Sequence, residues 1–288
     1  MNKSFKILFQ EQQVSLLEIK IGLINSYIKR YNIFYFIFQG INIKNMQLTQ
    51  TQINKFNKDG FIVLKNFANS QLCDDILHKA QVHLKNKIVP IESEQEYLRN
   101  SDSKTTLRRL RQVYGREEIF KIWMTNPEIK DILATLLNDK PVLVLAHHNS
   151  IMTKMPKISS RTFWHQDARY WNYENDNLIS VWLALGDEYL ENGLLEFIPG
   201  SHKMTFEKNQ FDEQSNFIDE NPENKKLIQT RVHINLSKGD VVLFHCKTLH
   251  HASKNITNDP KISFVYTVKG FHNKPIKNTR SDFDEIIL

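Results

Sequence analysis

Residues 161–171, Arg-Thr-Phe-Trp-His-Gln-Asp-Ala-Arg-Tyr-Trp, contain two side chains from which both fold and chemistry can be inferred. Alternate residues of an extended chain point to one side, so His165 and Asp167 can reach one metal ion while Gln166 faces elsewhere. A third candidate, His251, lies far downstream. Two histidines and one carboxylate leave coordination positions open, as in non-haem Fe(II) oxygenases. We therefore predict His165, Asp167 and His251 as the metal ligands and catalytic residues.

Short apolar segments bounded by turn residues follow this motif. Residues 180–185 form an apolar run of strand length. A second apolar run lies between the turn residues Asn192-Gly193 and Pro199-Gly200. Residues 239–245 contain a turn followed by a third apolar run. Hydrophobic residues make up 41% of the chain, which is enough for a large core. The pattern predicts an all-β barrel in the second half.

The order of these pieces resembles the phytanoyl-CoA dioxygenase family of Fe(II)/2-oxoglutarate oxygenases. The matching pieces are Trp-His-Gln-Asp (164–167), Trp-Leu-Ala-Leu (182–185), Glu-Asn-Gly-x-Leu-x-x-Ile-Pro-Gly-Ser-His (191–202), Gly-Asp-x-x-x-Phe-His (239–245) and His-x-Ser-x-Asn (251–255). Residues 48–64 also look like the first helix and strand of that family. The resemblance implies a mainly β fold with flanking helices, the double-stranded β-helix or jelly roll that cupins share.

Three histidines crowd the end of the last motif, and the resemblance chooses among them. The family places its iron ligand directly before x-Ser-x-Asn, which selects His251. In a regular strand His250 should then face the other way. For His245 and His250 we favour a structural, hydrogen-bonded role. His148, on a plausible strand near the site, has no predicted ligand role.

A 2-oxoglutarate enzyme holds a dianion, whose far carboxylate needs a cation. The family has an arginine about six residues after the Asn of its motif, and here that position is Lys261. Lysine can pair with a carboxylate as a point charge, without the fork geometry of arginine. The hydroxyl of Ser253 could bind the same carboxylate, and Lys154 is a second candidate cation. The resemblance also implies that Gln166 and Trp182 line the cosubstrate pocket.

These residues indicate an Fe(II)- and 2-oxoglutarate-dependent dioxygenase that uses O₂ to hydroxylate a small organic or lipid-like substrate, releasing succinate and CO₂. The intact Asp167 argues for hydroxylation, because iron halogenases that resemble this family replace the carboxylate with a small residue. Two alternatives stay open. One is a metal enzyme on the same barrel that does not use 2-oxoglutarate, and Lys261 in place of arginine keeps this alternative open. The other is a non-catalytic metal- or ligand-binding relative.

Motifs from residue 48 to residue 271 form one ordered set without a Pro/Gly/Ser-rich linker. We therefore expect one catalytic domain at residues 46–288, preceded by an extension at residues 1–45. The apolar run 31–43 in that extension is shorter than the roughly 20 residues of a membrane-spanning helix. A presequence, an amphipathic anchor and a wrong start assignment are the competing interpretations.

The formal net charge is +6, and residues 1–45 contribute six basic against two acidic side chains. The catalytic part is therefore close to balanced, and no nucleic-acid partner is required. Cys73 and Cys246 have no zinc or disulfide spacing, which fits a reducing compartment. We expect a cytoplasmic location, or a mitochondrion or peroxisome if the extension directs the chain there. Oligomeric state cannot be inferred from the sequence.

Amphipathic helices are predicted at residues 49–58, 70–87 and 126–137. The polar segment 206–227 contains no punctuated strand. Connections of this length in a compact domain are often functional, so we expect a mobile lid or specificity loop over the pocket, with a disordered segment without function as the alternative.

Overall fold

The apolar segments of the second half pair into two antiparallel sheets. In the computed structural model, which describes residues 47–98 and 106–288, the larger sheet has the order β1 (Phe61–Leu64), β9 (Val241–His245), β6 (Leu178–Ala184), β11 (Lys261–Gly270), β4 (Pro141–Lys154), β3 (Leu107–Arg111) and β2 (Ile91–Ser93), with β12 (Glu285–Ile287) paired to β4. The smaller sheet has the order β5 (Thr162–His165), β10 (His250–Ala252), β7 (Leu195–Phe197) and β8 (Val232–His233). The extension at residues 1–45, with the predictions made for it, lies outside the described residues.

The core lies between these two sheets. Trp182, Phe244 and Val265 of the larger sheet belong to one buried cluster with Phe197 and Ala252 of the smaller sheet. Two facing antiparallel sheets around a shared apolar interior are the architecture of a jelly roll. The predicted mainly β fold is therefore confirmed, as two packed sheets that do not close into a continuous barrel.

Strand β11 shows how the interior is built. All ten of its residues are buried, because β4 and β6 pair with its two edges and both of its faces are covered. Phe264 and Tyr266 on one face pack against Phe120 and Trp123 of the helical layer. Side chains alternate along a strand, so Lys261, Ser263 and Val265 share the opposite, inward face. This face carries polar groups into the core.

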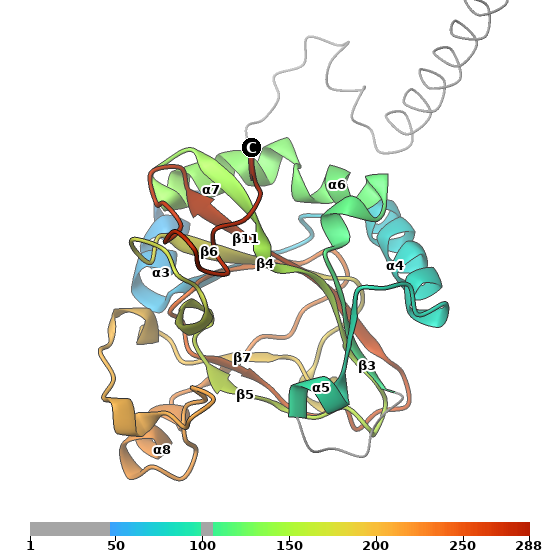
Figure 1. Ribbon diagram of the computed structural model, residues 1–288. Helices are drawn as coiled ribbons and strands as arrows, with labels where there is room; N and C mark the ends of the chain where they lie inside the picture. The colour runs from blue at the N-terminus through green and yellow to red at the C-terminus, as the bar shows by residue number, and fades with distance from the viewer. Residues whose placement is uncertain (1–46, 99–105) are drawn as a thin grey trace, which may run out of the picture. The chain divides into compact units, whose positions relative to one another are not determined.

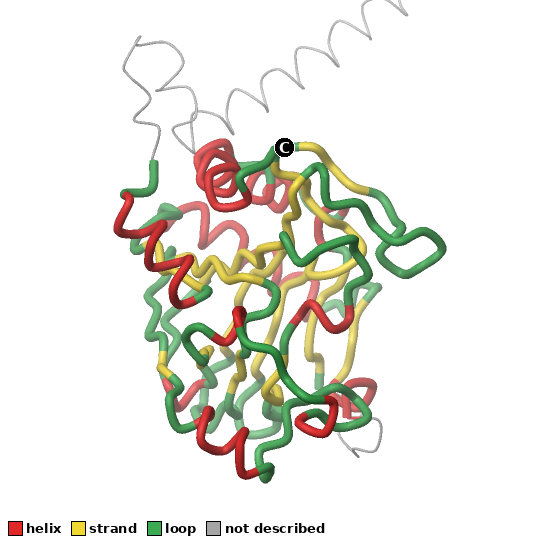
Figure 2. The backbone as a smooth tube through the Cα atoms, turned by 90° about the vertical axis from the view of Figure 1, so that its left-hand side faces the viewer, coloured by secondary structure: helices red, strands yellow, loops and turns green. Residues whose placement is uncertain are grey.

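A helical layer covers the outer face of the larger sheet (Figure 1). It contains α4 (Ser70–Lys85), α6 (Glu118–Met124) and α7 (Pro127–Leu137). Asn126 starts α7 by accepting hydrogen bonds from the N–H groups of Glu128 and Ile129, and Pro127 occupies the first helical position. Figure 2 shows the same layering from the side, with the strands between this layer and a region of loops and short helices.

The predicted helices are all present, with ends within two residues of the expected ones. The first is α3 (Gln50–Asp59), whose capping box joins Thr49 and Gln52 and whose last turn ends at Gly60 with φ 86°. The remaining short helices are α5 (Glu94–Leu98), α8 (Pro222–Ile228), η1 (Val113–Gly115), η2 (Asp167–Tyr170), η3 (Leu190–Asn192), η4 (Ser201–Lys203) and η5 (Lys208–Gln210). None of the helices in the described ranges is long and apolar enough to cross a membrane.

The segment expected to form a lid has a different place. Phe206, Phe211 and Phe217 contact one another and pack with Trp164 and Leu249 in a second apolar cluster. Trp164 alternates with His165 on β5, so this cluster lies on the outer face of the smaller sheet. Residues 206–228 therefore cover that outer face, and the prediction of a lid over the interior is wrong for this segment.

Candidate metal centre

Three side chains that can ligate a metal converge at one end of the interior. His165 ends β5, Asp167 begins η2 and His250 begins β10, and each offers one ligand atom within 4.8 Å of the other two. The Nε2 atoms of His165 and His250 lie 3.5 and 3.7 Å from Asp167 Oδ1. β5 and β10 pair so that His165 stands opposite His250, which places their rings 4.1 Å apart.

The second nitrogen of each histidine fixes the ring for this role. His165 Nδ1 lies 2.8 Å from the carbonyl oxygen of Phe163, and His250 Nδ1 lies 2.9 Å from that of Thr248. A carbonyl only accepts hydrogen bonds, so each Nδ1 carries the proton and each Nε2 keeps a free lone pair. Burial lowers the pKa of His250 to about 3 and also lowers that of His165, which keeps both rings neutral. Neutral, oriented imidazoles suit a divalent metal.

Asp167 supplies the negative charge. Its Oδ2 accepts a hydrogen bond of 2.9 Å from Ser180 on β6, and its Oδ1 lies 2.9 Å from His148 Nε2 on β4. Burial alone would raise the pKa of Asp167, but the electrostatic attraction of His148 and its hydrogen bond to Oδ1 outweigh burial and lower the pKa well below its usual value. The carboxylate is therefore ionised, as a metal ligand must be.

On β10 it is His250, and not the predicted His251, that belongs to the metal cluster. His251 points to the opposite face of the smaller sheet, where its Nδ1 lies 2.9 Å from Glu196 Oε2 and its ring stacks on Trp164 at 5.1 Å. The two histidines do face opposite ways, as strand alternation predicts, but it is His250 that faces inward. The pairing of His250 with His165 decides this, and that long-range register is not visible in the motif. The prediction of His251 as a ligand is thus corrected to His250.

Two further residues of the centre were missed. Ser180 and His148 hold the two oxygens of Asp167, yet neither was predicted to act there. A signal for Ser180 existed, since it is a hydroxyl in an apolar strand, two residues before Trp182 and thus on the same face. For His148 the only indication was its position on a plausible strand.

A second buried polar group lies further along the same strands. Glu188 Oε2 is 3.1 Å from Lys261 Nζ, while Glu188 Oε1 accepts hydrogen bonds from Ser263 Oγ at 2.6 Å and from Trp182 Nε1 at 3.0 Å. Lys261 Nζ also lies 5.0 Å from the centre of the Trp182 ring. Trp182 is two residues beyond Ser180 on the inward face of β6, which is about 7 Å of strand. We call Glu188, Lys261, Ser263 and Trp182 the carboxylate cluster.

The other predicted cosubstrate residues divide into two groups. Lys154 is buried opposite Lys261 in the β4–β11 register, and its Nζ donates to the carbonyls of Ser160 and Ala252 at 2.6 and 3.4 Å. Ser253 donates to the carbonyl of Leu190, and it is Ser263 that donates to the carboxylate paired with Lys261, so a contact of Ser253 with 2-oxoglutarate stays a prediction.

Gln166 does not contact the carboxylate cluster in any described hydrogen bond. Its side-chain amide donates to the carbonyl oxygen of Lys247 at 2.6 Å. This bond links Gln166 to the loop that leads into β10. Gln166 lies between the two ligands of the His-x-Asp motif. The structure thus brings Trp182, Lys261 and Lys154 to the far end of the interior and holds Gln166 elsewhere.

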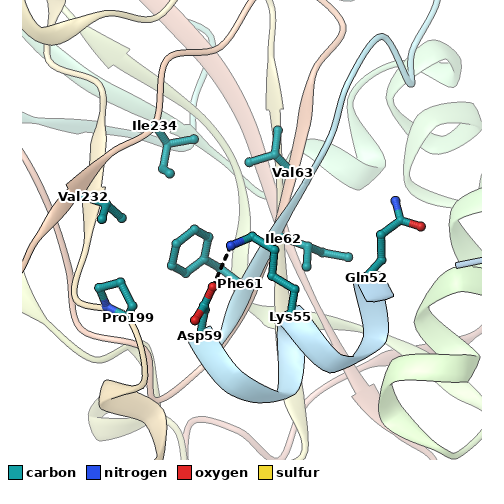
Figure 3. Close-up of a pocket in the computed structure, with 9 residues that line it drawn as sticks. All are labelled: Gln52, Lys55, Asp59, Phe61, Ile62, Val63, Pro199, Val232 and Ile234. Carbon is teal, nitrogen blue, oxygen red and sulfur yellow. Dashed lines mark hydrogen bonds and ion pairs between the residues drawn. The ribbon is translucent and has the colours of Figure 1, made fainter. Parts of the chain in front are cut away.

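A pocket of about 350 Å³ opens beside α3, between the sheet edges formed by β1 and β8. Figure 3 shows Phe61, Val232 and Ile234 along its apolar wall, with an ion pair of 2.6 Å between Lys55 and Asp59 at its rim. None of its lining residues belongs to the metal cluster or to the carboxylate cluster. The pocket is thus distinct from the candidate metal centre.

A known family matches most of the chain. The sequence profile described as Phytanoyl-CoA dioxygenase (PhyH) matches residues 56–263. Human peroxisomal phytanoyl-CoA dioxygenase is 24% identical over 235 residues, which cover 75% of this chain and 66% of the human protein. Bovine phytanoyl-CoA dioxygenase domain-containing protein 1 is 23% identical over 266 residues, covering 76% of this chain and 89% of the relative. The chain thus spans just under two thirds of the human protein.

Solved structures share the fold at low sequence identity. EctD from S. alaskensis, solved with 2-oxoglutarate and 5-hydroxyectoine, has a TM-score of 0.65 and 19% identity, covering 82% of this chain and 80% of EctD. The epimerase SnoN, solved with Fe³⁺, alpha-ketoglutarate and nogalamycin RO, has a TM-score of 0.64 and 18% identity, covering 78% of this chain and 84% of SnoN. At such identities the likeness establishes the fold.

Proposed function

Because the chain belongs to the phytanoyl-CoA dioxygenase (PhyH) family, as its motifs predicted, we propose that it is an Fe(II)- and 2-oxoglutarate-dependent dioxygenase that hydroxylates a small organic or lipid-like substrate. One observation carries the proposal. One ionised carboxylate and two free imidazole lone pairs face a common position inside the jelly roll. They belong to Asp167, His165 and His250. This is the two-histidine, one-carboxylate donor set of non-haem iron oxygenases.

Each residue of the centre has a definite role in this proposal. His165, Asp167 and His250 would hold the iron. The carbonyls of Phe163 and Thr248 fix the two ring orientations, and Ser180 and His148 fix the carboxylate. Such supporting hydrogen bonds normally strengthen metal binding by orienting the ligands. With iron, 2-oxoglutarate and O₂ bound, the centre supplies oxidative decarboxylation to succinate and CO₂ together with hydroxylation of a C–H bond.

The surroundings favour a substrate with apolar parts. The ring of Phe244 lies 4.9 Å from the ring of His250, and that of Phe197 lies 5.9 Å from it. Both phenylalanines belong to the buried core between the sheets. Apolar walls exclude water from a reactive centre and bind hydrocarbon better than a charged group.

The test of this function is turnover by the purified full-length protein. We expect succinate to form from 2-oxoglutarate only when Fe(II) and O₂ are both supplied, slowly without substrate and faster with a productive one. Succinate is quantified by mass spectrometry, with oxygen consumption followed in parallel. Iron binding without succinate across a broad substrate panel would support the non-catalytic alternative. Iron-dependent oxygen consumption without 2-oxoglutarate would support the alternative metal enzyme.

The cellular location and partners belong to the same proposal. We place the protein in the cytoplasm and expect a small-molecule substrate and no nucleic-acid partner, since the catalytic part carries nearly balanced charge. The human relative is named as peroxisomal. Residues 1–45 could direct this chain to a peroxisome or mitochondrion, and imaging of the full-length chain with and without those residues distinguishes the three compartments.

A further inference from the structure

Glu188 is an unusual residue to find in the apolar interior between two sheets. It is 1% exposed, and its carboxylate receives the ammonium group of Lys261 and the donors of Ser263 and Trp182, at 3.1, 2.6 and 3.0 Å. One cation and two neutral donors converging on a carboxylate are what a protein builds to bind an anionic ligand. Here the anion comes from the chain itself.

The position of this cluster relative to the metal centre follows from two strands. Ser180, which holds Asp167, and Trp182, which donates to Glu188, share the inward face of β6. On β11, Lys261 and Ser263 share the inward face with Val265 of the core. The carboxylate cluster therefore lies about 7 Å, or two strand residues, along β6 from Ser180, which donates a hydrogen bond to the metal ligand Asp167. A five-carbon 2-oxo diacid that chelates a metal at one end can span this separation.

The neighbouring cations are already engaged. Lys154 Nζ has three acceptors, the carbonyls of Ser160 and Ala252 and the hydroxyl of Thr162. Arg108 Nη1 lies 3.3 Å from Glu94 Oε2. A second carboxylate entering this end would thus compete with Glu188 for Lys261. Two carboxylates sharing one ammonium group in a buried site repel each other.

We propose that Glu188 determines the cosubstrate preference of this enzyme by occupying the site for the far carboxylate of a 2-oxo diacid. This inference rests on the proposed function and refines it. A 2-oxo acid without a second carboxylate leaves the Glu188–Lys261 pair intact. 2-Oxoglutarate has to displace Glu188 from Lys261, Ser263 and Trp182, so its second carboxylate adds little net affinity.

The backbone around Glu188 confines that displacement to the side chain. The N–H of Glu188 donates to the carbonyl of Leu236 at 2.8 Å, and the N–H of Leu236 donates back to the carbonyl of Glu188 at 3.0 Å. This pair of hydrogen bonds fixes the main chain between β6 and η3. Changing the carboxylate alone therefore tests the competition without moving the strands.

The experiment compares binding of 2-oxoglutarate and of 2-oxopentanoate, which has the same carbon chain without the second carboxylate. Both are titrated anaerobically into the Fe(II)-loaded full-length protein and followed by calorimetry and by the visible absorption of the iron chelate. The wild type should bind 2-oxopentanoate at least as tightly as 2-oxoglutarate. Glu188→Gln keeps the size of the side chain and removes its charge, so it should raise 2-oxoglutarate affinity by about tenfold or more. Affinity for 2-oxopentanoate should change little.

Two controls sharpen the result. Glu191→Gln is the same substitution on an exposed residue three positions away and should leave both affinities unchanged. The double variant Glu188→Gln/Lys261→Met should lose the gain in 2-oxoglutarate affinity, because the cation is then absent.

The outcomes separate the two proposals. A wild type that binds 2-oxoglutarate tenfold tighter than 2-oxopentanoate overturns the role of Glu188 while leaving the dioxygenase proposal standing, and this needs no variant. Unchanged or weaker 2-oxoglutarate binding in a folded Glu188→Gln protein overturns it as well. Failure of the iron-loaded protein to bind either acid overturns both.

Discussion

The two ends of the jelly-roll interior each hold a buried carboxylate, and the partners of the two carboxylates differ. At the metal end, Asp167 is ionised and two imidazole lone pairs point toward it, at 3.5 and 3.7 Å, with no proton to share. At the other end, Glu188 has a cation and two further donors. A buried donor set with no partner for its lone pairs indicates an external cation, whereas a satisfied cluster indicates that the chain supplies its own ligand.

The largest effect is expected when the anionic ligand of the metal centre, Asp167, is removed. Asp167→Ala should abolish Fe(II) binding and succinate formation, since two neutral imidazoles alone hold iron weakly. Equilibrium dialysis followed by iron quantification measures this. Asp187→Ala, on an exposed aspartate in the turn after β6, is the matched control and should bind iron normally. Normal iron content in Asp167→Ala would show that the centre lies elsewhere.

Removing the cation of the carboxylate cluster should mainly lower the free energy of unfolding. Lys261→Ala leaves Glu188 as a buried carboxylate without its cation, which costs about 3–5 kcal/mol of folding free energy. Urea unfolding followed by circular dichroism measures the loss. The double variant Lys261→Met/Glu188→Gln, which leaves no unpaired charge, should recover most of it. Equal losses in the single and double variants would mean that the ion pair is not the source of the effect.

A smaller effect is expected from the support of Asp167. Ser180→Ala removes the hydrogen bond to Oδ2 and should weaken iron binding by about 10–100-fold, as is typical for residues that orient metal ligands. Competition with a chelator of known affinity measures this. Ser263→Ala is the corresponding change at the other end and should leave iron affinity intact. Iron affinity that falls equally in both variants would argue against separate roles for the two ends.

The smallest effect concerns the histidine on the outer face of β10. His251→Ala removes the hydrogen bond to Glu196 and the stacking on Trp164, and should lower the free energy of unfolding by about 1–3 kcal/mol. Thermal unfolding measures this, with iron content unchanged in the folded protein. A variant as stable as the wild type would contradict the structural role assigned to His251.

Much of the fold was accessible from local sequence. Capping residues such as Thr49 and Asn126 stand next to amphipathic runs, so the helices could be predicted to within two residues. The two-residue spacing of His165 and Asp167 indicated a shared target for the same reason, because it depends only on local geometry.

The predictions that failed concern residues whose orientation or burial depends on contacts between segments far apart in the sequence. Alternation along β10 places His250 and His251 on opposite faces, but only the pairing with β5 determines which one faces inward. Ser263 was not predicted, although it lies two residues after Lys261 and therefore on the same face of β11. Glu188 carried no signal at all, because an acidic residue beside Asp187 in a turn reads as exposed. Its burial depends on contacts with residues 48 and 73 positions downstream, Leu236 and Lys261.

The most direct test of the metal centre compares iron binding by the wild type, His250→Ala and His251→Ala, prepared and loaded anaerobically in parallel. The inward-facing cluster predicts about one Fe(II) per chain in the wild type and in His251→Ala, and none retained by His250→Ala after dialysis. Retention of iron by His250→Ala together with its loss from His251→Ala would contradict the register of β10 and the site built on it.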